Sequence, residues 1–161
     1  MDDLGNNPNM HKQPNSDDCF VCGRDNPHGL YMTFYDNGED EVHSQYCVAE
    51  AYNGYPGVVH GGIVATMLDE AIGRVAFIAD HHHFMMTVRL QVKYRHPVPT
   101  NTPLQIVGRI VRLRGRIGKA VGEIRAGDGS VLAEAELLLA DMPAEMLVGV
   151  NLRRLGWRVD E

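Results

Sequence analysis

The 161-residue sequence has little cysteine and no long apolar run. Its three cysteines, Cys19, Cys22 and Cys47, are too few and odd in number for a disulfide scaffold, which favours a reducing setting. No apolar run approaches the roughly 20 residues that cross a bilayer. The first residues, MDDLGNN, lack the basic start and apolar core of a secretory signal. The sequence therefore predicts a cytoplasmic protein that does not engage a membrane.

Positive charge is also scarce. Fifteen Lys and Arg residues against 21 Asp and Glu residues give a formal net charge of −6. This balance disfavours nonspecific binding to nucleic acid, although it leaves room for a local basic patch. A hydrophobic fraction of 44% and a charged fraction of 22% are ordinary for a globular protein. We therefore expect one domain with a substantial core and no nucleic-acid partner.

The chain divides into three parts by composition. Residues 1–18 are rich in Asn, Asp and Pro, with little to bury, and are predicted to be a disordered leader. Residues 19–140 carry the alternating and periodic apolar patterns of a folded domain. Residues 141–161 form a C-terminal tail whose apolar side chains can pack on that domain.

Six segments show the alternation or β-branched content of strands. The predicted strands are 30–35, 42–48, 87–95, 104–114, 117–126 and 131–140. Asp128-Gly129 is predicted to form a two-residue hairpin turn, so the last three strands form an antiparallel meander.

One long helix is predicted between the second and third strands, from Ile63 to Ala79. Apolar residues surround most of its circumference, which is typical of a buried helix. Gly73 lies inside it and is expected to permit close packing. The fold class is therefore α+β, with a curved antiparallel sheet wrapped around one central helix.

The Gly-rich loop 51–62 ends in a glycine pair, Gly61-Gly62, that leads into this helix. The first N–H groups of a helix lack intrahelical partners, and the helix dipole favours negative charge there. An oxygen that gains charge during attack on a carbonyl would be stabilised at this point. The alternative is a turn that needs glycine only for unusual backbone angles.

Asp69 lies in the middle of the apolar helix. A buried carboxylate is costly unless it is paired or functional, so Asp69 is a candidate general base or nucleophile. The alternative places it on an exposed polar stripe with Glu70 and Arg74. Glu70 is predicted to be a bystander that pairs with Arg74 at the surface.

The spacing of these groups predicts a dimer. From His60 to Asp69 the helix rises about 13.5 Å and turns by about 180°. The Gly61 amide and the Asp69 carboxylate of one chain therefore cannot flank the same carbonyl. If both take part in the chemistry, two chains must share each site.

Two motifs together resemble those of the hotdog-fold acyl-CoA thioesterases, with the phenylacetyl-CoA type as the nearest group. The first is Tyr55-Pro-Gly-Val-Val-His-Gly-Gly62 followed by the acid in the helix, and the second is Cys19-x-x-Cys22-Gly with Asn-Pro-His-Gly-Leu over 26–30. The resemblance covers roughly residues 19–140. It implies a hotdog fold, an acyl-CoA substrate, no cofactor or metal, and sites at the interface of a homodimer, with a dimer of dimers (a homotetramer) expected.

The resemblance also implies roles for three more residues. Thr87 matches a Ser or Thr that holds the attacking water or the carboxylate, although a β-branched residue is ordinary in a strand. His60 either polarises the carbonyl or fixes the loop. The family's Asn or Gln lies six residues before the motif His, where this chain has Gly54; Asn53, one residue earlier, is the candidate to replace it.

Substrate contacts are predicted on two surfaces. Met67, Leu68, Ile72 and Phe84 are expected to line the acyl pocket. Arg114, Arg116 and Lys119 surround a predicted turn, where the resemblance places the CoA phosphates. The alternative for these cations is an ordinary solvated strand face.

A metal site is not predicted. Cys19-x-x-Cys22 suggests zinc, with His28 or Cys47 as further ligands, but no second cysteine or histidine pair follows. The expected function is hydrolysis of an acyl-CoA thioester to a free acid and CoA. The alternatives are a non-catalytic hotdog protein that binds acyl-CoA or lipid, and a hotdog hydratase.

Overall fold

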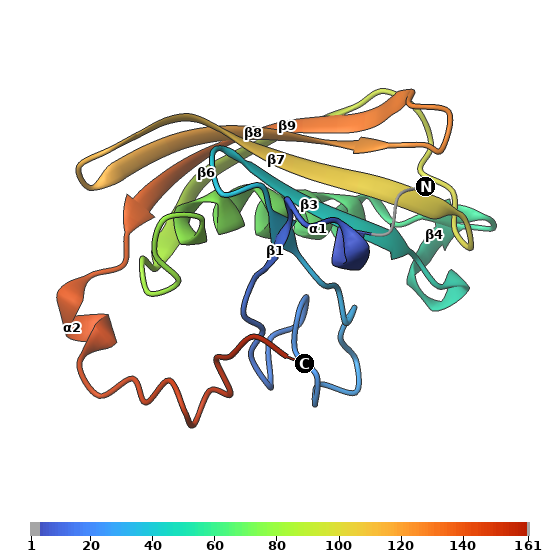
Figure 1. The fold of residues 1–161 in the computed structure, drawn as a ribbon. Helices are drawn as coiled ribbons and strands as arrows, with labels where there is room; N and C mark the ends of the chain where they lie inside the picture. Colours follow the sequence, from blue (N-terminus) through green and yellow to red (C-terminus); the bar gives the residue numbers. More distant parts are fainter. Residues whose placement is uncertain (1–3, 161) are drawn as a thin grey trace.

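Four long strands form most of a curved antiparallel sheet in the computed structural model, which describes residues 4–160. They are β6 Met85–Tyr94, β7 Pro103–Arg114, β8 Ile117–Arg125 and β9 Val131–Asp141. The complete sheet has the order β1-β2-β3-β7-β8-β9-β6, and it curves over helix α1 (Gly61–Gly73) (Figure 1). This is the hotdog architecture that the sequence predicted.

The remaining elements are short. They are β1 His11–Lys12, β2 Tyr35–Asp36, β3 Glu41–Cys47, β4 Asn53–Tyr55, β5 Val58–Val59, the 3-10 turns η1 Leu4–Asn6, η2 Glu50–Tyr52 and η3 Arg74–Phe77, and helix α2 Ala144–Leu147. No helix in the described part of the chain is long and apolar enough to cross a membrane.

Helix α1 supplies the centre of the core. The residues that it buries are Val64, Met67, Leu68, Ala71 and Ile72, each at most 1% exposed. The inner face of the sheet meets them with alternating residues, among them Ile106, Leu137 and Leu139. The predicted helix 63–79 differs at both ends, because α1 starts at Gly61 and narrows to the 3-10 turn η3 after Gly73.

The close contact between helix and sheet depends on glycines of the sheet. A Cβ on Gly108 would lie 2.4 Å from the Ala71 carbonyl oxygen, and one on Gly122 would lie 2.5 Å from Ile72 Cγ1. The helical Gly73 was predicted to have this role, but a Cβ there would meet nothing nearer than 3.9 Å. The strands therefore approach the helix at β7 and β8.

The four strands after the helix match their predicted ranges to within two residues. The predicted strand 30–35 is different, because only Tyr35 enters a ladder, although Leu30, Met32 and Phe34 are buried in alternation. The two-residue hairpin turn lies at Gly115-Arg116, where Gly115 has φ +61°. Asp128-Gly129 belongs to a longer loop, closed by the bond from the Gly129 N–H to the Ala126 carbonyl.

The structure also differs from the predicted disorder of residues 1–18. Residues 1–3 lie outside the described part of the chain, but His11–Lys12 pairs with β2, and Gln13 and Asn15 are buried. The Gln13 amide donates to Asp36 Oδ2 at 2.9 Å, and the Asn15 amide donates to Asp160 Oδ2 at 2.7 Å. Specific polar partners therefore order a segment whose composition has little hydrophobic content.

The C-terminal segment lies on the side of α1 away from the sheet (Figure 1). The Trp157 indole donates to the His81 carbonyl at 2.9 Å and packs against Phe77 and Phe84, with ring centroids 4.9 and 5.4 Å away. The Arg158 carbonyl accepts a bond from the Asn15 N–H. The C-terminal segment thus meets both the region that follows α1 and the part of the N-terminal segment around Asn15.

We expect Gly108→Ala to destabilise the fold by about 1–3 kcal/mol or more, because its new methyl group would collide with the backbone of α1. Gly127→Ala is the control, since a Cβ at Gly127 meets nothing within 4 Å. Urea denaturation measures both. Equal stability of the two variants would contradict the close approach of β7 to the helix.

Candidate active site

His60 caps the N-terminus of α1. Its Nδ1 accepts the Gly62 N–H at 2.9 Å, which fixes the ring proton on Nε2 in the neutral form. The His60 carbonyl accepts the N–H groups of Ile63 and Val64. The side chain therefore holds the loop in place, one of the two roles considered for it, and the Gly62 N–H is occupied.

The Gly61 N–H remains available at the start of the helix, with no acceptor among the described residues. The Tyr94 hydroxyl donates to the Gly61 carbonyl at 2.7 Å, which ties this end of α1 to β6. A cavity of about 320 Å³ adjoins this point. Its lining consists of Val58, Val59, Gly61, Val64, Tyr94, Arg95, His96, Pro97 and Val98.

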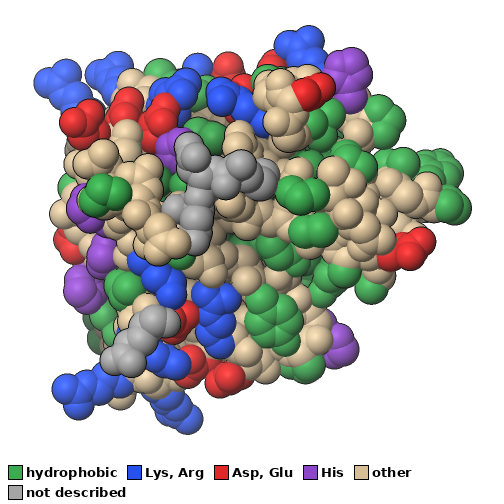
Figure 2. Space-filling model, turned by 45° about the vertical axis from the view of Figure 1, so that its right-hand side comes forward, with side chains coloured by type: hydrophobic (Ala, Val, Ile, Leu, Met, Phe, Trp, Pro, Cys, Tyr) green, Lys and Arg blue, Asp and Glu red, His purple; other side chains and the backbone are tan. Residues whose placement is uncertain are grey.

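The surface around this region contains exposed aromatic side chains. Tyr94 is 53% exposed and Tyr55, in the adjacent hairpin β4–β5, is 76% exposed. On the face drawn in Figure 2, hydrophobic side chains gather on the right, whereas Lys and Arg side chains lie mostly on the left. An apolar surface next to an unpaired amide can receive a ligand with an apolar part and a carbonyl group.

Asp69 is half-buried where α1 faces β6. The Thr87 hydroxyl donates to Asp69 Oδ1 at 2.7 Å, so the structure joins two of the predicted site residues. Burial raises the pKa of the Asp69 carboxyl, and the negative charge of Glu70 adds to this, while the Thr87 hydrogen bond opposes it. A carboxylate with a raised pKa and a fixed orientation is suited to accept a proton.

The two groups lie toward opposite ends of β6. Gly61 is bonded to Tyr94 at one end, and Asp69 is bonded to Thr87 near the other. Thr87 and Tyr94 are seven positions apart along the strand, or about 23 Å at the usual rise. One chain therefore does not bring the Gly61 amide and the Asp69 carboxylate to the same atom, as the helix geometry predicted.

Asn53 is exposed at the start of β4, where it is paired with Val59. Next to it, a Cβ on Gly54 would lie 3.2 Å from the His60 Cα, so the backbone of the loop lies close against the motif histidine. Asn53 is thus near His60 in the fold. Its contact with a substrate stays a prediction.

Three residues predicted for the acyl pocket lie elsewhere. Met67, Leu68 and Ile72 are fully buried between helix and sheet, and none of them lines the cavity beside Gly61 or the cavity on the outer face of the sheet. The fourth, Phe84, belongs to the aromatic cluster with Phe77 and Trp157. These apolar helix residues next to Asp69 were expected to face a ligand, whereas in the single chain they face the sheet.

The predicted CoA-binding cations lie at the Met85 end of the sheet. Arg114 ends β7 and Arg116 lies in the β7–β8 turn; the Arg116 carbonyl accepts the N–H of Asp141, which is opposite Met85. Lys119 points to the outer face, 3.3 Å from Glu136. Within one chain these cations are therefore far from Gly61 and on the side of Thr87.

A second cavity, of about 420 Å³, lies on the outer face of the sheet. Its polar lining includes Gln91, Lys93, Arg109, Glu123, Glu134 and Glu136. It is on the face away from α1 and contains none of the predicted catalytic residues.

Glu70 and Arg74 differ from their predicted surface roles. They form the predicted ion pair, at 2.8 Å, but Arg74 is only 1% exposed and lies over the Phe34 ring, 4.4 Å from its centroid. Arg74 Nη1 donates to the Pro14 carbonyl. The pattern of the helix did not predict that Arg74 is buried, because the residues that cover it come from the N-terminal segment.

The two cysteines of the N-terminal motif lie close to the Glu70 carboxylate. Ligand atoms of Cys19, Cys22 and Glu70 all lie within 4.8 Å of one another, whereas Cys47 is exposed elsewhere. A hydrogen bond from the Cys19 thiol, together with the charge of Arg74, lowers the pKa of Cys22 against the opposing effect of burial, whereas the same hydrogen bond and burial raise the pKa of Cys19. The sequence indicated His28 or Cys47 as further ligands, and nothing in it pointed to Glu70.

Known proteins support the same architecture. Residues 56–133 match the family model described as Thioesterase superfamily. A solved thioesterase superfamily protein is 30% identical, with a TM-score of 0.69 over 78% of this chain and 61% of that one. A hypothetical thioesterase from Streptococcus pneumoniae TIGR4, solved with coenzyme A, is 19% identical, with a TM-score of 0.60 over 65% of this chain and 80% of that one.

Among curated proteins, the chain is similar to the acyl-coenzyme A thioesterase THEM4 of Xenopus laevis. The two are 30% identical over 102 residues, which are 63% of this chain and 45% of the relative. The chain spans about half the length of the curated relatives that it matches, or less.

We expect Thr87→Val to raise the pKa of Asp69 further, because the hydroxyl that stabilises the charged carboxylate is removed. Carboxyl-carbon NMR titration measures this as a midpoint moved to higher pH. Thr87→Ser keeps a donor and is expected to titrate like the wild type. An unchanged midpoint in Thr87→Val would contradict the hydrogen bond.

Proposed function

We propose that this chain is a member of the thioesterase superfamily and that it hydrolyses acyl-CoA thioesters at two sites shared between the chains of a homodimer. The THEM4 relative is named as an acyl-coenzyme A thioesterase, and the pneumococcal protein with the same fold was solved with coenzyme A. These likenesses support the substrate class. The arrangement of the site rests on the geometry of this chain.

The observation that carries the proposal is the position of the two groups along β6. This strand is at the end of the sheet order, so within residues 4–160 it has a neighbouring strand on one side only. Its exposed residues include Met86, Val88 and Tyr94. An edge strand of this length is a template for pairing with another chain.

Two-fold pairing of β6 with a second β6 would complete the site. In an antiparallel pair centred near the middle of the strand, Thr87 of one chain lies opposite Tyr94 of the other. The Asp69 bonded to that Thr87 would then face the Gly61 of the partner subunit. The same operation repeats the arrangement at the other end and gives two equal sites.

The chemistry follows from what each group offers. The Gly61 N–H would stabilise the oxygen of the thioester carbonyl as it gains charge. Asp69 would take a proton from water that attacks the carbonyl carbon, or attack that carbon itself. The bond from carbon to sulfur then breaks, and CoA leaves as the thiolate, which takes up the proton from Asp69 or from solvent. If Asp69 is the nucleophile, water then hydrolyses the acyl–Asp69 anhydride and releases the free acid. Thr87 positions Asp69 for this step.

The same pairing gives the cations and the cavity a role. The β7–β8 turn with Arg114 and Arg116 lies at the Thr87 side of its own chain, so it would approach the partner's Gly61 and meet the CoA phosphates. The 320 Å³ cavity next to Gly61 would receive the beginning of the acyl group. A dimer of dimers could use the outer face of the sheet, where the second cavity lies.

A thiol-release assay over a panel of acyl-CoA esters tests the function. Gly61→Pro removes the proposed N–H donor, and proline is favoured at the first helical position. His60, at φ −58° and ψ 134°, already has a backbone that can precede proline. Gly61→Ala keeps the N–H, and its Cβ would meet only Tyr94, at 3.5 Å.

We expect Gly61→Pro to lower kcat by about 100-fold or more, and Gly61→Ala to stay within a few-fold of wild type. Asp69→Asn is expected to lose activity by about 100-fold or more while keeping the Thr87 bond. If wild type binds CoA esters but releases no thiol from any of them, the protein is a binding module. Full turnover in Asp69→Asn would contradict the catalytic role of that residue.

A further inference from the structure

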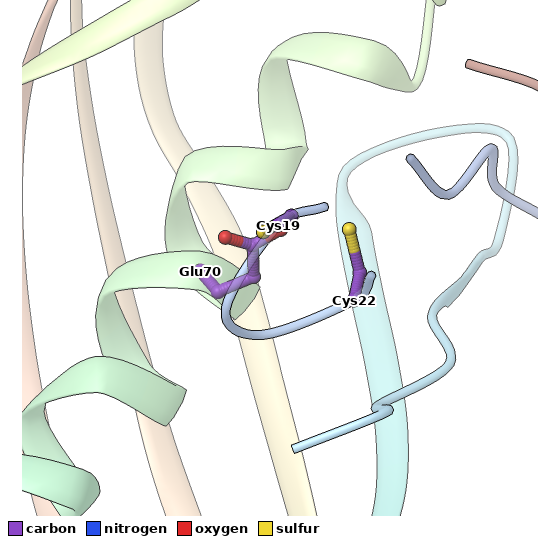
Figure 3. Close-up of side chains that lie close together, drawn as sticks. All are labelled: Cys19, Cys22 and Glu70. Atoms are coloured by element: carbon purple, nitrogen blue, oxygen red, sulfur yellow. The ribbon is translucent and has the colours of Figure 1, made fainter. Parts of the chain in front are cut away.

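Cys19, Cys22 and Glu70 form a cluster outside the proposed thioesterase site. Figure 3 shows the two cysteines on one turn of the N-terminal chain and Glu70 projecting toward Cys19 from α1. Their ligand atoms lie within 4.8 Å of one another, and Cys22 is 2% exposed. In a tetrahedral zinc site, two sulfurs lie about 3.7 Å apart, given zinc–sulfur bonds of about 2.3 Å. The two sulfurs of the cluster, at most 4.8 Å apart, would need to approach each other by no more than about 1 Å to reach this spacing.

Backbone hydrogen bonds fix the turn that carries the two cysteines, and one of them is made to a cysteine sulfur. The Val21 N–H donates to Cys19 Sγ at 3.3 Å, and the Gly23 N–H donates to the Cys19 carbonyl at 2.9 Å. A Cβ on Gly23 would lie 2.3 Å from that carbonyl oxygen, so only glycine permits the turn. Backbone N–H groups directed at sulfur stabilise a thiolate, the form that binds metal.

Arg74 gives a second observation on the cluster. Its side chain is almost fully buried, Nε binds Glu70 Oε1, and Nη2 has no hydrogen-bond partner among the described residues. One carboxylate oxygen of Glu70 thus remains for another partner. With Glu70 and two thiolates the negative charge is three, and Arg74 supplies one positive charge. A divalent cation would make the group neutral, which is the favourable state for buried charges.

We propose that Cys19, Cys22 and Glu70 bind one Zn²⁺ ion, with water as the fourth ligand. Two sulfur ligands and one oxygen ligand suit zinc, whereas Mg²⁺ and Ca²⁺ require oxygen. The ion would fasten the N-terminal segment to the middle of α1. It would be separate from the thioester chemistry, because the neighbouring Asp69 binds Thr87 on the β6 side of the helix.

The test measures metal in the full-length protein, purified under reducing conditions and without chelator. Elemental analysis gives the zinc content per chain. Replacement by Co²⁺ gives an absorption spectrum in which thiolate–cobalt charge-transfer bands report sulfur ligands, and intense visible bands report tetrahedral geometry. The variants are Cys22→Ser and Glu70→Gln. Their matched controls are Cys47→Ser, which changes an exposed cysteine outside the cluster, and Glu136→Gln, on the outer face of the sheet.

We expect one zinc per chain in the wild type and in both controls, with loss of stoichiometric binding in Cys22→Ser and weaker binding in Glu70→Gln. Zinc added to the metal-free wild type should raise the melting temperature, a readout that does not depend on the variants. The proposal would be overturned if the wild-type protein bound no zinc although a thiol assay detected all three of its cysteines in the reduced form. So would a Cys19–Cys22 disulfide under these conditions, or a cobalt spectrum without charge-transfer bands.

Discussion

The hydrogen bond from Thr87 to Asp69 places a carboxylate at the boundary between the buried helix and the edge strand β6. Burial raises the pKa of that carboxyl, and the bond keeps it directed toward the edge of the sheet. Near the other end of β6, the bond from the Gly62 N–H to His60 caps α1, and the Gly61 N–H has no acceptor among the described residues. Because both groups are fixed by the fold and neither can reach the other, a site that used both of them would need a second copy of the chain.

The sequence was most informative where one physical rule dominated. Alternation predicted the four strands after the helix, because each has one face on the core and one in solvent. The spacing of Gly61 and Asp69 on a helix was enough to separate them. The pairing of Thr87 with Asp69 joins residues 18 positions apart, and it came from family resemblance rather than from periodicity. Composition failed for residues 11–15, since Gln13 and Asn15 are ordered by partners distant in the chain.

The direction of side chains on the buried helix was the second feature that the sequence did not predict. Met67, Leu68 and Ile72 were assigned to a pocket because they are apolar and near Asp69, but a helix packed against a curved sheet buries those residues in the protein itself. Arg74 was assigned to the surface, and the N-terminal segment covers it. In both cases the deciding contacts come from parts of the chain that no local pattern reveals. The Glu70–Cys19–Cys22 cluster depends on the same covering segment.

The central claim, that each site combines Gly61 of one chain with Asp69 of the other, is tested most directly by subunit complementation. Asp69→Asn and Gly61→Pro dimers, each inactive alone, are mixed and allowed to exchange subunits. A mixed dimer then has one intact site and one doubly defective site. The account predicts recovery to about one quarter of wild-type activity for random exchange. A mixture that exchanges subunits and stays as inactive as its parents would contradict it.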